Sequence, residues 1–468
     1  MVIRTGRADL DFGGIRTEFG LPGEFPPAAL AEAQAAVSRD IGSADREDAT
    51  ALPLVTIDPP GAKDLDQALL VQRVGSGFRV HYAIADLGVF VVPGGALDTE
   101  VRKRGQTLYL PDGNVPLHPP VLSEGAASLL PGQARPSVLW TFECGPDGEP
   151  VDVRVRRAVV RSTAQFDYET VQASFDAGTP HPSVEALPDF GRLRRERAAE
   201  RGAVELQLPE QEIVPNGDGD WKLVVRPRAD VDAWNAEISL LTGMSAARVM
   251  LDAKVGVLRT LPDADDGAVD ALRRSAQALG VPWPDGVSPA RLLAGLDPSR
   301  PESLALFVDA TRLLRGAGYT AFNGEVPAVS THAGLGAPYT HVTAPLRRLV
   351  DRFAAEVCLA VTAGREVPGW LTEALPLLPG LMGGSDALAG KVDRACLDQV
   401  EAWVLADRVG QEFEAVVLRA DGNGADVFIP QPPVMSRCTG EDLPEGERIG
   451  VRLVEADPER RKVVFERL

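Results

Sequence analysis

Three aspartates lie within nine residues of one another early in the chain. Asp58, Asp64 and Asp66 belong to the stretch 56–67, in which a Pro-Pro-Gly turn separates two apolar runs that are typical of buried strands. Carboxylates this close repel one another, and a hard divalent cation such as Mg²⁺ relieves that repulsion. The pattern indicates metal-assisted phosphate chemistry. The alternative is a polar surface turn; the spacing does not fit an EF-hand loop.

A second segment combines a histidine with two adjacent arginines, in the order Tyr-Thr-His-Val-Thr-Ala-Pro-Leu-Arg-Arg. Pro345 suits the first turn of a helix, so Arg347 and Arg348 are expected near a helix N-terminus, where guanidinium and free N–H groups bind phosphate. The alternative is an arginine pair that bridges carboxylates between a sheet and a helix. His332 and His341 are candidate ligands or bases, although an isolated histidine is more often a structural hydrogen-bonding residue.

The totals indicate an ordinary soluble protein of several domains. The chain has 468 residues, of which 44% are hydrophobic and 25% charged, and this length suggests two to four domains. A net charge of −19 argues against a protein that wraps nucleic acid by charge alone, but permits a basic channel in an acidic body. The four cysteines are scattered, which argues against a zinc site or a disulfide framework. No signal peptide or membrane-spanning run is visible, so a cytoplasmic location without membrane contact is expected.

The order of the elements that must position these residues predicts an α+β fold. A short N-terminal segment, 1–47, contains one Pro-initiated helix and could contact RNA, and strand-like runs with Gly and Pro turns follow to about residue 160. Residues 410–468 return to short alternating strands, which suits an OB-type barrel; such barrels often bind single-stranded nucleic acid, the alternative being a structural cap. Helices are expected at 26–39, 189–202, 232–256, 265–279, 302–316, 346–362 and 386–409.

The two motifs together resemble the ribonuclease II (RNB) family of exoribonucleases. The turn 56–67 looks like that family's Thr-Ile-Asp…Asp-x-Asp-Asp turn, and the arginine segment resembles its Tyr-Thr-x-x-Thr-Ser-Pro-Ile-Arg-Arg segment. Shorter matches between them fall in the family's order, including Ile84-Ala85-Asp86 and Tyr109-Leu110-Pro111. The resemblance implies an RNB-like catalytic domain of mixed sheet and helices over 48–409 and an OB-fold RNA-binding domain over 410–468. It leaves no room for the family's usual N-terminal cold-shock barrels.

The resemblance also implies an activity. Family members are processive 3′→5′ hydrolytic exoribonucleases that degrade single-stranded RNA to nucleoside 5′-monophosphates with Mg²⁺, mostly as monomers; Mn²⁺ is an alternative metal. RNA with a single-stranded 3′ end is therefore the expected partner.

The roles that the resemblance carries over, position by position, fall on eight residues. Those expected to hold metal and the attacking water are Asp58, Asp64, Asp66 and Gln67. Those expected to act directly in catalysis are Asp64, Asp66 and Arg347, with Arg347 neutralising charge on the transferring phosphate. Those expected to contact RNA are Tyr168, which would stack on the terminal base, Tyr109, which would stack at the far end of the gripped bases, and Arg348.

Three departures from the family pattern leave alternatives open. Gln67 stands where the family has a fourth acid, Ala344 replaces the serine of the second motif, and Leu349 replaces its closing aromatic. A neutral amide oxygen ligates metal more weakly than a carboxylate, so a non-catalytic RNA-binding relative is a second hypothesis. A metal-dependent phosphoesterase for small molecules is a third, against which the OB-like tail and Tyr168 count.

Overall fold

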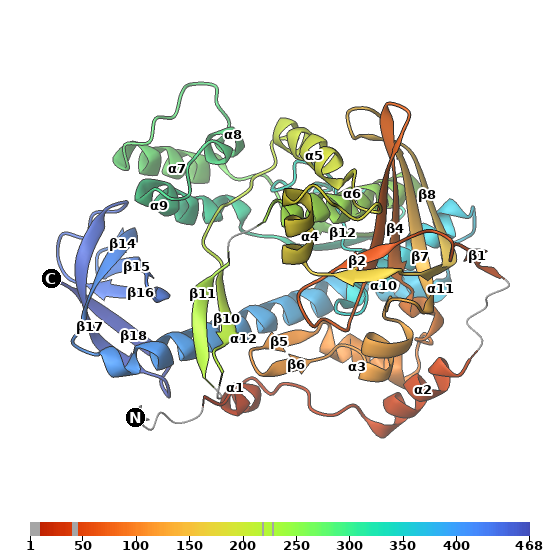
Figure 1. Cartoon of the computed structure of the whole chain (residues 1–468), viewed down its shortest axis with the longest axis horizontal. Coiled ribbons are helices and arrows are strands. Elements are labelled where there is room, and N and C mark those ends of the chain that lie inside the picture. Colours follow the sequence, from red (N-terminus) through yellow and green to blue (C-terminus); the bar gives the residue numbers. More distant parts are fainter. Residues whose placement is uncertain (1–9, 40–44, 218–219, 227–228) are drawn as a thin grey trace.

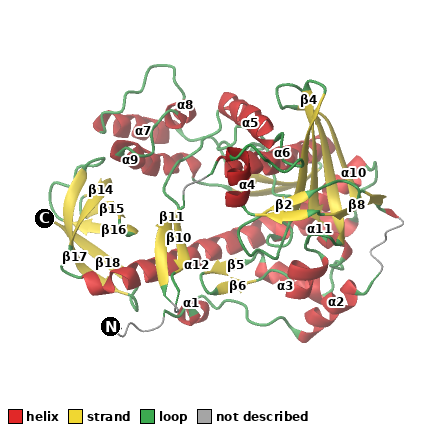
Figure 2. Cartoon of the chain, viewed as in Figure 1, coloured by secondary structure: helices red, strands yellow, loops and turns green. Residues whose placement is uncertain are grey.

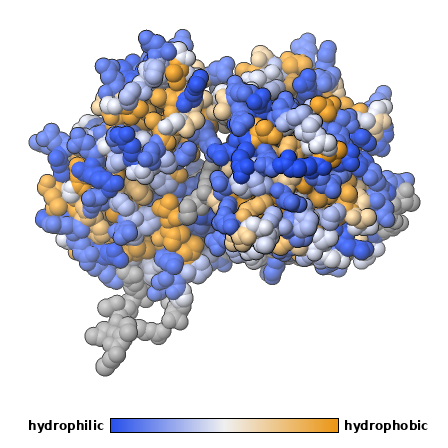
Figure 3. Space-filling model, turned by 45° about the horizontal axis from the view of Figure 1, so that its top comes forward, coloured by the Kyte–Doolittle hydropathy of each residue, from blue (hydrophilic) through white to orange (hydrophobic). Residues whose placement is uncertain are grey.

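The computed structural model describes residues 10–39, 45–217, 220–226 and 229–468. The fold is α+β, as expected. A seven-stranded sheet with helices around it forms one end of the molecule, and a small β-barrel forms the other (Figures 1 and 2). In the face that Figure 3 displays, hydrophilic side chains predominate and hydrophobic ones form small separate patches. Within the described residues, no helix is both long and apolar enough to cross a membrane.

The large sheet has the strand order β1-β8-β7-β4-β3-β2-β9. Its central pairs are antiparallel, whereas β1 and β9 pair in parallel at the two edges. More than half of its strand residues are buried. Buried strands have continuous apolar runs, and the strands predicted from such runs are confirmed. The bounds are β1 Glu47–Asp48, β2 Val55–Ile57, β3 Gln67–Val74, β4 Gly77–Ala85, β7 Ala134–Cys144, β8 Pro150–Arg161 and β9 Ala164–Phe166.

Helices pack against this sheet and against one another to form its main core. The longest of this group, α6, contacts both α5 and α10, and all three contribute buried residues. The first helices, α1 and α2, fall in the N-terminal segment where a helix was expected; residues 1–9 and 40–44 of that segment lie outside the described residues. The bounds are α1 Gly13–Glu18, α2 Pro27–Val37, α3 Ala96–Arg104, α4 Tyr168–Asp176, α5 Leu187–Arg201, α6 Asp230–Ala253, α7 Asp266–Ala278, α8 Pro289–Ala294, α9 Pro301–Ala310, α10 Leu349–Thr362, α11 Gly369–Ala374 and α12 Leu378–Leu405.

The sequence pattern overlooked several strands after residue 164. The predicted helix 232–256 ends at Ala253, because Lys254 adopts a left-handed conformation with φ of 57° and a strand begins at Val255. β-Branched valines at 255 and 257 favour that strand. The ribbons and hairpins outside the large sheet are β5 Leu108–Leu110, β6 Gly113–Val115, β10 Gln211–Pro215, β11 Trp221–Val225, β12 Val255–Thr260 and β13 Gly318–Asn323.

The barrel at the C-terminal end is closed, with the strand order β14-β15-β16-β18-β17. Four of its strands were expected, and β16 was overlooked. The 28-residue helix α12 contacts barrel strands at its far end and the β5 hairpin near its start, so it connects the two halves of the molecule (Figure 1). The bounds are β14 Glu412–Asp421, β15 Gly424–Pro430, β16 Pro433–Thr439, β17 Arg448–Asp457 and β18 Lys462–Arg467.

A second core fills the barrel and continues between it and α12. Phe12, which immediately precedes α1, and Ile15 of α1 pack into it, and the Phe12 ring lies edge-on to Trp221 of β11, with 5.8 Å between ring centroids. Gln399 of α12 donates a hydrogen bond to the backbone carbonyl of Asp11. Residues 11–15 therefore contact both α12 and the β10–β11 hairpin, whereas α2 packs against α3.

Candidate active site

The aspartate-rich turn joins strands β2 and β3 at one edge of the large sheet. The backbone N–H of Asp58 donates to the carbonyl of Phe166 on β9, at 3.0 Å. Further along the turn, the Ser128 hydroxyl donates to the Lys63 carbonyl at 2.6 Å and accepts from the Leu65 N–H at 3.0 Å. These bonds hold one end of the turn to strand β9 and the other to the loop that contains Ser128, which restricts the directions in which the carboxylates point.

Asp66 is the residue at which the two sequence motifs meet. Its carboxylate is buried; Oδ1 accepts from the backbone N–H of Leu346 at 2.8 Å, and Oδ2 lies 3.5 Å from Nε of Arg347. Burial raises the pKa of Asp66 to about 8, although the Arg347 charge and the Leu346 hydrogen bond act to lower it. A buried hydrogen bond therefore joins Asp66 to Leu346, 280 positions away in the sequence, and Arg347 lies beside the same carboxylate.

Asp58 brings a second, partly buried carboxylate close to Asp64 and Arg347. Burial and, to a smaller extent, the negative charge of Asp64 raise its pKa to about 6, although Thr56 and Arg347 act to lower it. Its Oδ2 is buried and has no hydrogen-bond partner among the described residues. A buried, unpartnered carboxylate oxygen beside a second carboxylate is the environment that a hard cation satisfies.

The donor set therefore fits Mg²⁺ or Mn²⁺ chemically. Within the described residues, no three acidic, histidine or cysteine side chains already converge on one metal position. Mg²⁺ commonly binds through one or two carboxylates and takes its other ligands from water and substrate phosphate, so a complete protein cage is not required.

Both polar atoms of the Gln67 side-chain amide form hydrogen bonds with the protein. Its Nε2 donates to the carbonyl of Thr343 at 2.6 Å, and its Oε1 accepts from the Tyr82 hydroxyl at 2.8 Å. A carbonyl can only accept, so the orientation of the amide is fixed by chemistry. The Thr343 hydroxyl is in turn 2.8 Å from that of Ser239 on α6. Gln67 thus connects β3 to the arginine segment, and its role as a metal ligand stays a prediction.

The two arginines of the second motif have different surroundings. The Arg347 side chain is 48% exposed and faces Asp66, whereas the Arg348 guanidinium makes two hydrogen bonds, of 2.6 and 2.9 Å, to the buried carboxylate of Asp351. For Arg348, the structure therefore displays the carboxylate-bridging alternative, and its RNA contact remains only a prediction. The expected helix begins at Leu349, so Pro345 precedes it rather than lying in its first turn.

The two tyrosines expected to stack on RNA both lie close to the aspartate-rich turn. Tyr168 is half-buried at the start of α4, and its hydroxyl accepts from Nδ2 of Asn235. Burial raises the pKa of Tyr168, and the nearby Asp58 charge adds to this effect. The Tyr109 ring is exposed on the β5–β6 hairpin, and its hydroxyl donates to Oδ2 of Asp64 at 3.3 Å. Stacking of Tyr109 at the far end of the gripped bases stays a prediction.

The histidines singled out in the sequence have structural surroundings. Nδ1 of His341 lies 2.7 Å from the Tyr319 hydroxyl, and burial holds the pKa of His341 well below its usual value. Burial also lowers the pKa of His332. Both rings pack against Tyr339, which supports the alternative of structural histidines.

Sequence reasoning missed the residues that support the arginine segment. Asp351 accepts from the backbone N–H of Ala344 at 2.7 Å, in addition to its bonds with Arg348, and buried His118 has Nδ1 3.0 Å from the Leu346 carbonyl. The spacing of three residues between Arg348 and Asp351 was a usable signal for a helical ion pair. His118 and Tyr82 carried no such signal, because their partners are distant in the sequence.

The structure combines a mixed sheet that carries a carboxylate–guanidinium site with a closed five-stranded barrel, and comparison with known proteins specifies the family. Residues 46–361 match the RNB domain, and residues 411–468 match the C-terminal S1 domain of RNase II-type exonucleases. The first match covers more than half of the chain, so the protein belongs to the RNB family. The solved apo structure of Mycoplasma genitalium RNase R has the same fold, with a TM-score of 0.88 at 20% identity over 98% of this chain and 77% of that one.

Relatives in the family differ in activity. Ribonuclease R of Escherichia coli (strain K12) is 27% identical over 94% of this chain and 60% of its own length. Two Arabidopsis thaliana sequences are each 30% identical over 65% of this chain and 32% of their own length; one is named DIS3-like exonuclease 2 and the other Inactive exonuclease DIS3L2. The chain thus spans less than two thirds of the length of these relatives, and similarity alone does not decide its activity.

Proposed function

We propose that this protein is a 3′→5′ exoribonuclease that hydrolyses single-stranded RNA processively to nucleoside 5′-monophosphates with Mg²⁺. The single observation that carries the proposal is the contact of buried Asp66 with Leu346 N–H and Arg347, which unites a metal-type carboxylate with a phosphate-type guanidinium. Membership of the RNB family supports the same reaction class. The cytoplasm is the proposed location, and a monomer the proposed working form.

In this proposal, Asp58, Asp64 and Asp66 hold the metal. Bound there, Mg²⁺ would supply a Lewis acid at the scissile phosphate and lower the pKa of the attacking water. The Oδ2 atom of Asp58 has no hydrogen-bond partner among the described residues, so a bound ion would supply its missing interaction. Gln67 would hold the turn in place through its bonds to Thr343 and Tyr82, whether or not its oxygen also reaches the metal.

Side chains of the protein would stabilise the transferring phosphate and position the RNA. Arg347, half-exposed beside Asp66, would neutralise charge that develops on the transferring phosphate. Tyr168, next to Asp58, would stack on the terminal base and so place the last phosphodiester over the carboxylates. Tyr109 would contact RNA close to Asp64, and the C-terminal barrel would bind the strand further from its 3′ end.

A time course on 5′-labelled single-stranded RNA tests the proposal, with wild type and Asp66→Asn in Mg²⁺, in Mn²⁺ and in EDTA. We expect mononucleotides and a short end product from wild type with metal, and neither from Asp66→Asn nor in EDTA. Because one Arabidopsis relative is named inactive and Gln67 replaces an acid, the second candidate is an RNA-binding protein without turnover. RNA that is bound by wild type but stays whole in both metals would establish that candidate and overturn the proposal.

A further inference from the structure

The β5–β6 hairpin, which carries Tyr109, depends on other parts of the chain for its position. Among the described strands, β5 and β6 pair only with each other, and each has three residues. A hairpin of this size is marginally stable by itself, so contacts outside it must hold it in place. Because the Tyr109 hydroxyl donates to Asp64, those contacts decide where Tyr109 lies relative to the candidate active site.

The base of the hairpin is attached to the arginine segment. The backbone N–H of Thr107, which precedes β5, donates to the carbonyl of Arg347 at 2.9 Å. The Thr107 hydroxyl accepts from the N–H of Leu117, which follows β6, at 3.0 Å. Both strands are therefore joined at this end, next to the candidate active site. The opposite end of the hairpin is the turn at residues 111–112.

The turn of the hairpin is bound by the N-terminal segment. The Arg16 guanidinium of α1 donates two hydrogen bonds, of 2.8 and 2.7 Å, to the two carboxylate oxygens of Asp112. A bidentate pair of this kind is directional, because the planar guanidinium fits the carboxylate in one orientation. Helix α1 and strand β5 also both pack against α12, so the ion pair joins two elements that share a support.

The side chains of β5 alternate between this support and the candidate active site. Leu108 and Leu110 are buried and belong to the same core as Ile15 of α1. Tyr109 lies between them and points to the opposite face of the strand, where its hydroxyl contacts Asp64. A movement of the hairpin turn away from α1 would therefore change the position of Tyr109 relative to Asp64.

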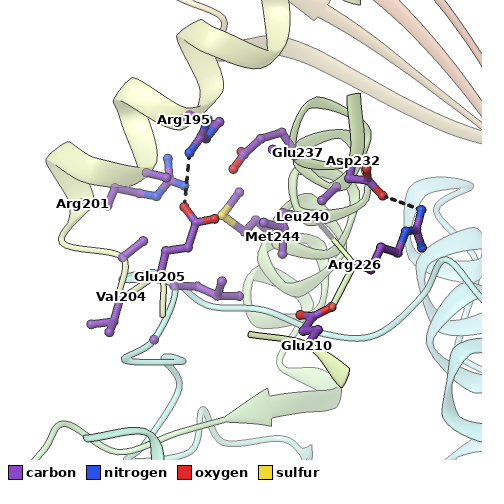
Figure 4. A pocket seen from close by; sticks show the side chains of 16 residues that line it. Arg195, Arg201, Val204, Glu205, Glu210, Arg226, Asp232, Glu237, Leu240 and Met244 are labelled. Atoms are coloured by element: carbon purple, nitrogen blue, oxygen red, sulfur yellow. Dashed lines mark hydrogen bonds and ion pairs between the residues drawn. The ribbon is translucent and has the colours of Figure 1, made fainter. Parts of the chain in front are cut away.

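Tyr168, the other tyrosine expected to contact RNA, has a separate support. The Cζ atom of Arg226 lies 5.5 Å from the centroid of its ring, and Nη2 of Arg226 lies 3.4 Å from Oδ1 of Asp232 on α6. Figure 4 shows this Arg226–Asp232 pair beside α6. Neither residue belongs to the N-terminal segment, so a change at Arg16 should affect Tyr109 and leave Tyr168 in place.

We propose that Arg16 is a positioning residue, which acts through Asp112 and the β5–β6 hairpin to hold Tyr109 beside Asp64, where it can contact RNA. The RNA contact rests on the proposed function, whereas the placement of Tyr109 does not. The N-terminal segment thereby acts on the candidate site from outside the match to the RNB domain, which begins at residue 46.

Fluorine NMR of the full chain labelled with 3-fluorotyrosine tests the placement without RNA or metal. The chain has five tyrosines, and Tyr109→Phe identifies the signal of Tyr109. We expect Arg16→Gln to shift or broaden that signal and to leave the others unchanged. The matched control is Glu18→Gln on the same helix, which removes an ion pair with Arg461 of the barrel and should change none of the signals. An unchanged Tyr109 signal in Arg16→Gln would overturn the proposal.

Binding of labelled RNA in EDTA, measured by fluorescence anisotropy, tests the consequence. Arg16→Gln should weaken binding about two- to fivefold, as expected for loss of a partly exposed ion pair, and should add no further loss to Tyr109→Ala. Asp112→Asn should also weaken binding, although it removes a negative charge. The exchange of Arg16→Asp with Asp112→Arg should restore the affinity. Tighter binding by Asp112→Asn would indicate a direct electrostatic effect on RNA and would overturn the proposal.

The two measurements separate this proposal from the proposed function. If wild type binds no RNA but Arg16→Gln shifts the Tyr109 signal, the proposed function fails and the positioning of Tyr109 by Arg16 is supported. If wild type binds RNA, and Arg16→Gln and Asp112→Asn bind it as tightly as wild type does, the ion pair has no effect on RNA binding and the proposal is contradicted.

Discussion

Gln67 donates a hydrogen bond of 2.6 Å to the backbone carbonyl of Thr343, across 276 positions of sequence. This bond connects the strand that follows the aspartate-rich turn to the arginine segment. The same amide accepts a hydrogen bond from Tyr82, so both of its polar ends are engaged. The residue that departs from the family's acidic pattern is therefore a connection between the two halves of the candidate site.

Replacing Gln67 with aspartate should reduce activity rather than raise it. Aspartate is shorter and cannot donate to the Thr343 carbonyl, which is buried and would lose its partner. An unsatisfied buried acceptor costs about 1–3 kcal/mol, so we expect a loss of this size in the free energy of unfolding together with slower RNA turnover. Chemical denaturation and single-turnover kinetics measure the two quantities.

Tyr82→Phe is the matched comparison for Gln67→Asp, because it removes only the hydroxyl that donates to Oε1. In a double-mutant cycle the two changes should be non-additive, since they affect the same hydrogen-bonded group. If Gln67→Asp instead speeds RNA cleavage and binds Mg²⁺ more tightly in calorimetry, then residue 67 is primarily a metal-ligand position.

Substitutions of the two neighbouring arginines should affect different properties, namely activity at Arg347 and stability at Arg348. Arg347→Ala should lower the turnover number with little effect on stability, because its side chain is half-exposed. Arg348→Ala should lower the free energy of unfolding by about 3–5 kcal/mol, because it leaves the buried Asp351 carboxylate without its partner charge. Parallel urea denaturation and RNA assays test this; a large stability loss in Arg347→Ala would contradict the assignment.

This division between adjacent arginines illustrates what could and could not be predicted. The residue types and spacing around Asp58–Asp66 and Arg347 indicated metal and phosphate chemistry with alternatives left open, and the family resemblance joined the two motifs into one expected site. The sequence did not distinguish Arg347 from Arg348, since that difference depends on which side chain faces Asp351 after the segment folds. The sheet, most helices and the barrel followed from apolar periodicity. Lys254 carried no comparable signal, so the end of α6 was predicted wrongly.

Contacts between segments that are distant in the sequence could not be predicted from local patterns. A buried tyrosine in a strand such as Tyr82 is typical of core packing, and only the pairing of β3 with β4 brings its hydroxyl to Gln67. The position of Tyr109 depends on how the β5–β6 hairpin lies beside Asp64. Neither relationship has a signature in local sequence, because 15 positions separate Gln67 from Tyr82 and 45 separate Asp64 from Tyr109.

Tyr168→Ala should weaken RNA binding by about 1–3 kcal/mol if the ring stacks on a base. Tyr168→Phe is its control, because it keeps the ring and removes only the hydroxyl that accepts from Asn235. Fluorescence anisotropy with labelled RNA in EDTA measures binding without cleavage. Equal loss of affinity in the two variants would indicate that the hydroxyl contact, rather than stacking, accounts for the effect.

Glu401 should make stability depend on pH at the junction of α12 and the barrel. Its buried Oε1 accepts from Gln211 and from the backbone N–H of Met435, and burial raises the pKa of Glu401 to about 7. A carboxyl group whose pKa is higher in the folded state binds its proton more tightly there. Its stabilising contribution is therefore complete below the unfolded pKa, near 4.5, and is lost as the pH rises through about 7.

Glu401→Gln should reduce this pH dependence, because glutamine keeps the accepting oxygen but does not ionise. Denaturation of wild type and variant across the window from the unfolded to the folded pKa is the measurement. Glu459→Gln, at an exposed position in the barrel, is the control and should retain the wild-type slope. An unchanged slope in Glu401→Gln would contradict the assignment.

The most direct test of the account follows the last phosphodiester of the RNA itself. Single-stranded RNA that carries its radiolabel only in the 3′-terminal phosphodiester is incubated with wild type, Asp66→Asn and Arg347→Ala in Mg²⁺. The account predicts that wild type releases the label first and as a nucleoside 5′-monophosphate, and that both variants release it far more slowly. Label that first appears in longer fragments, or that both variants release at the wild-type rate, would contradict it.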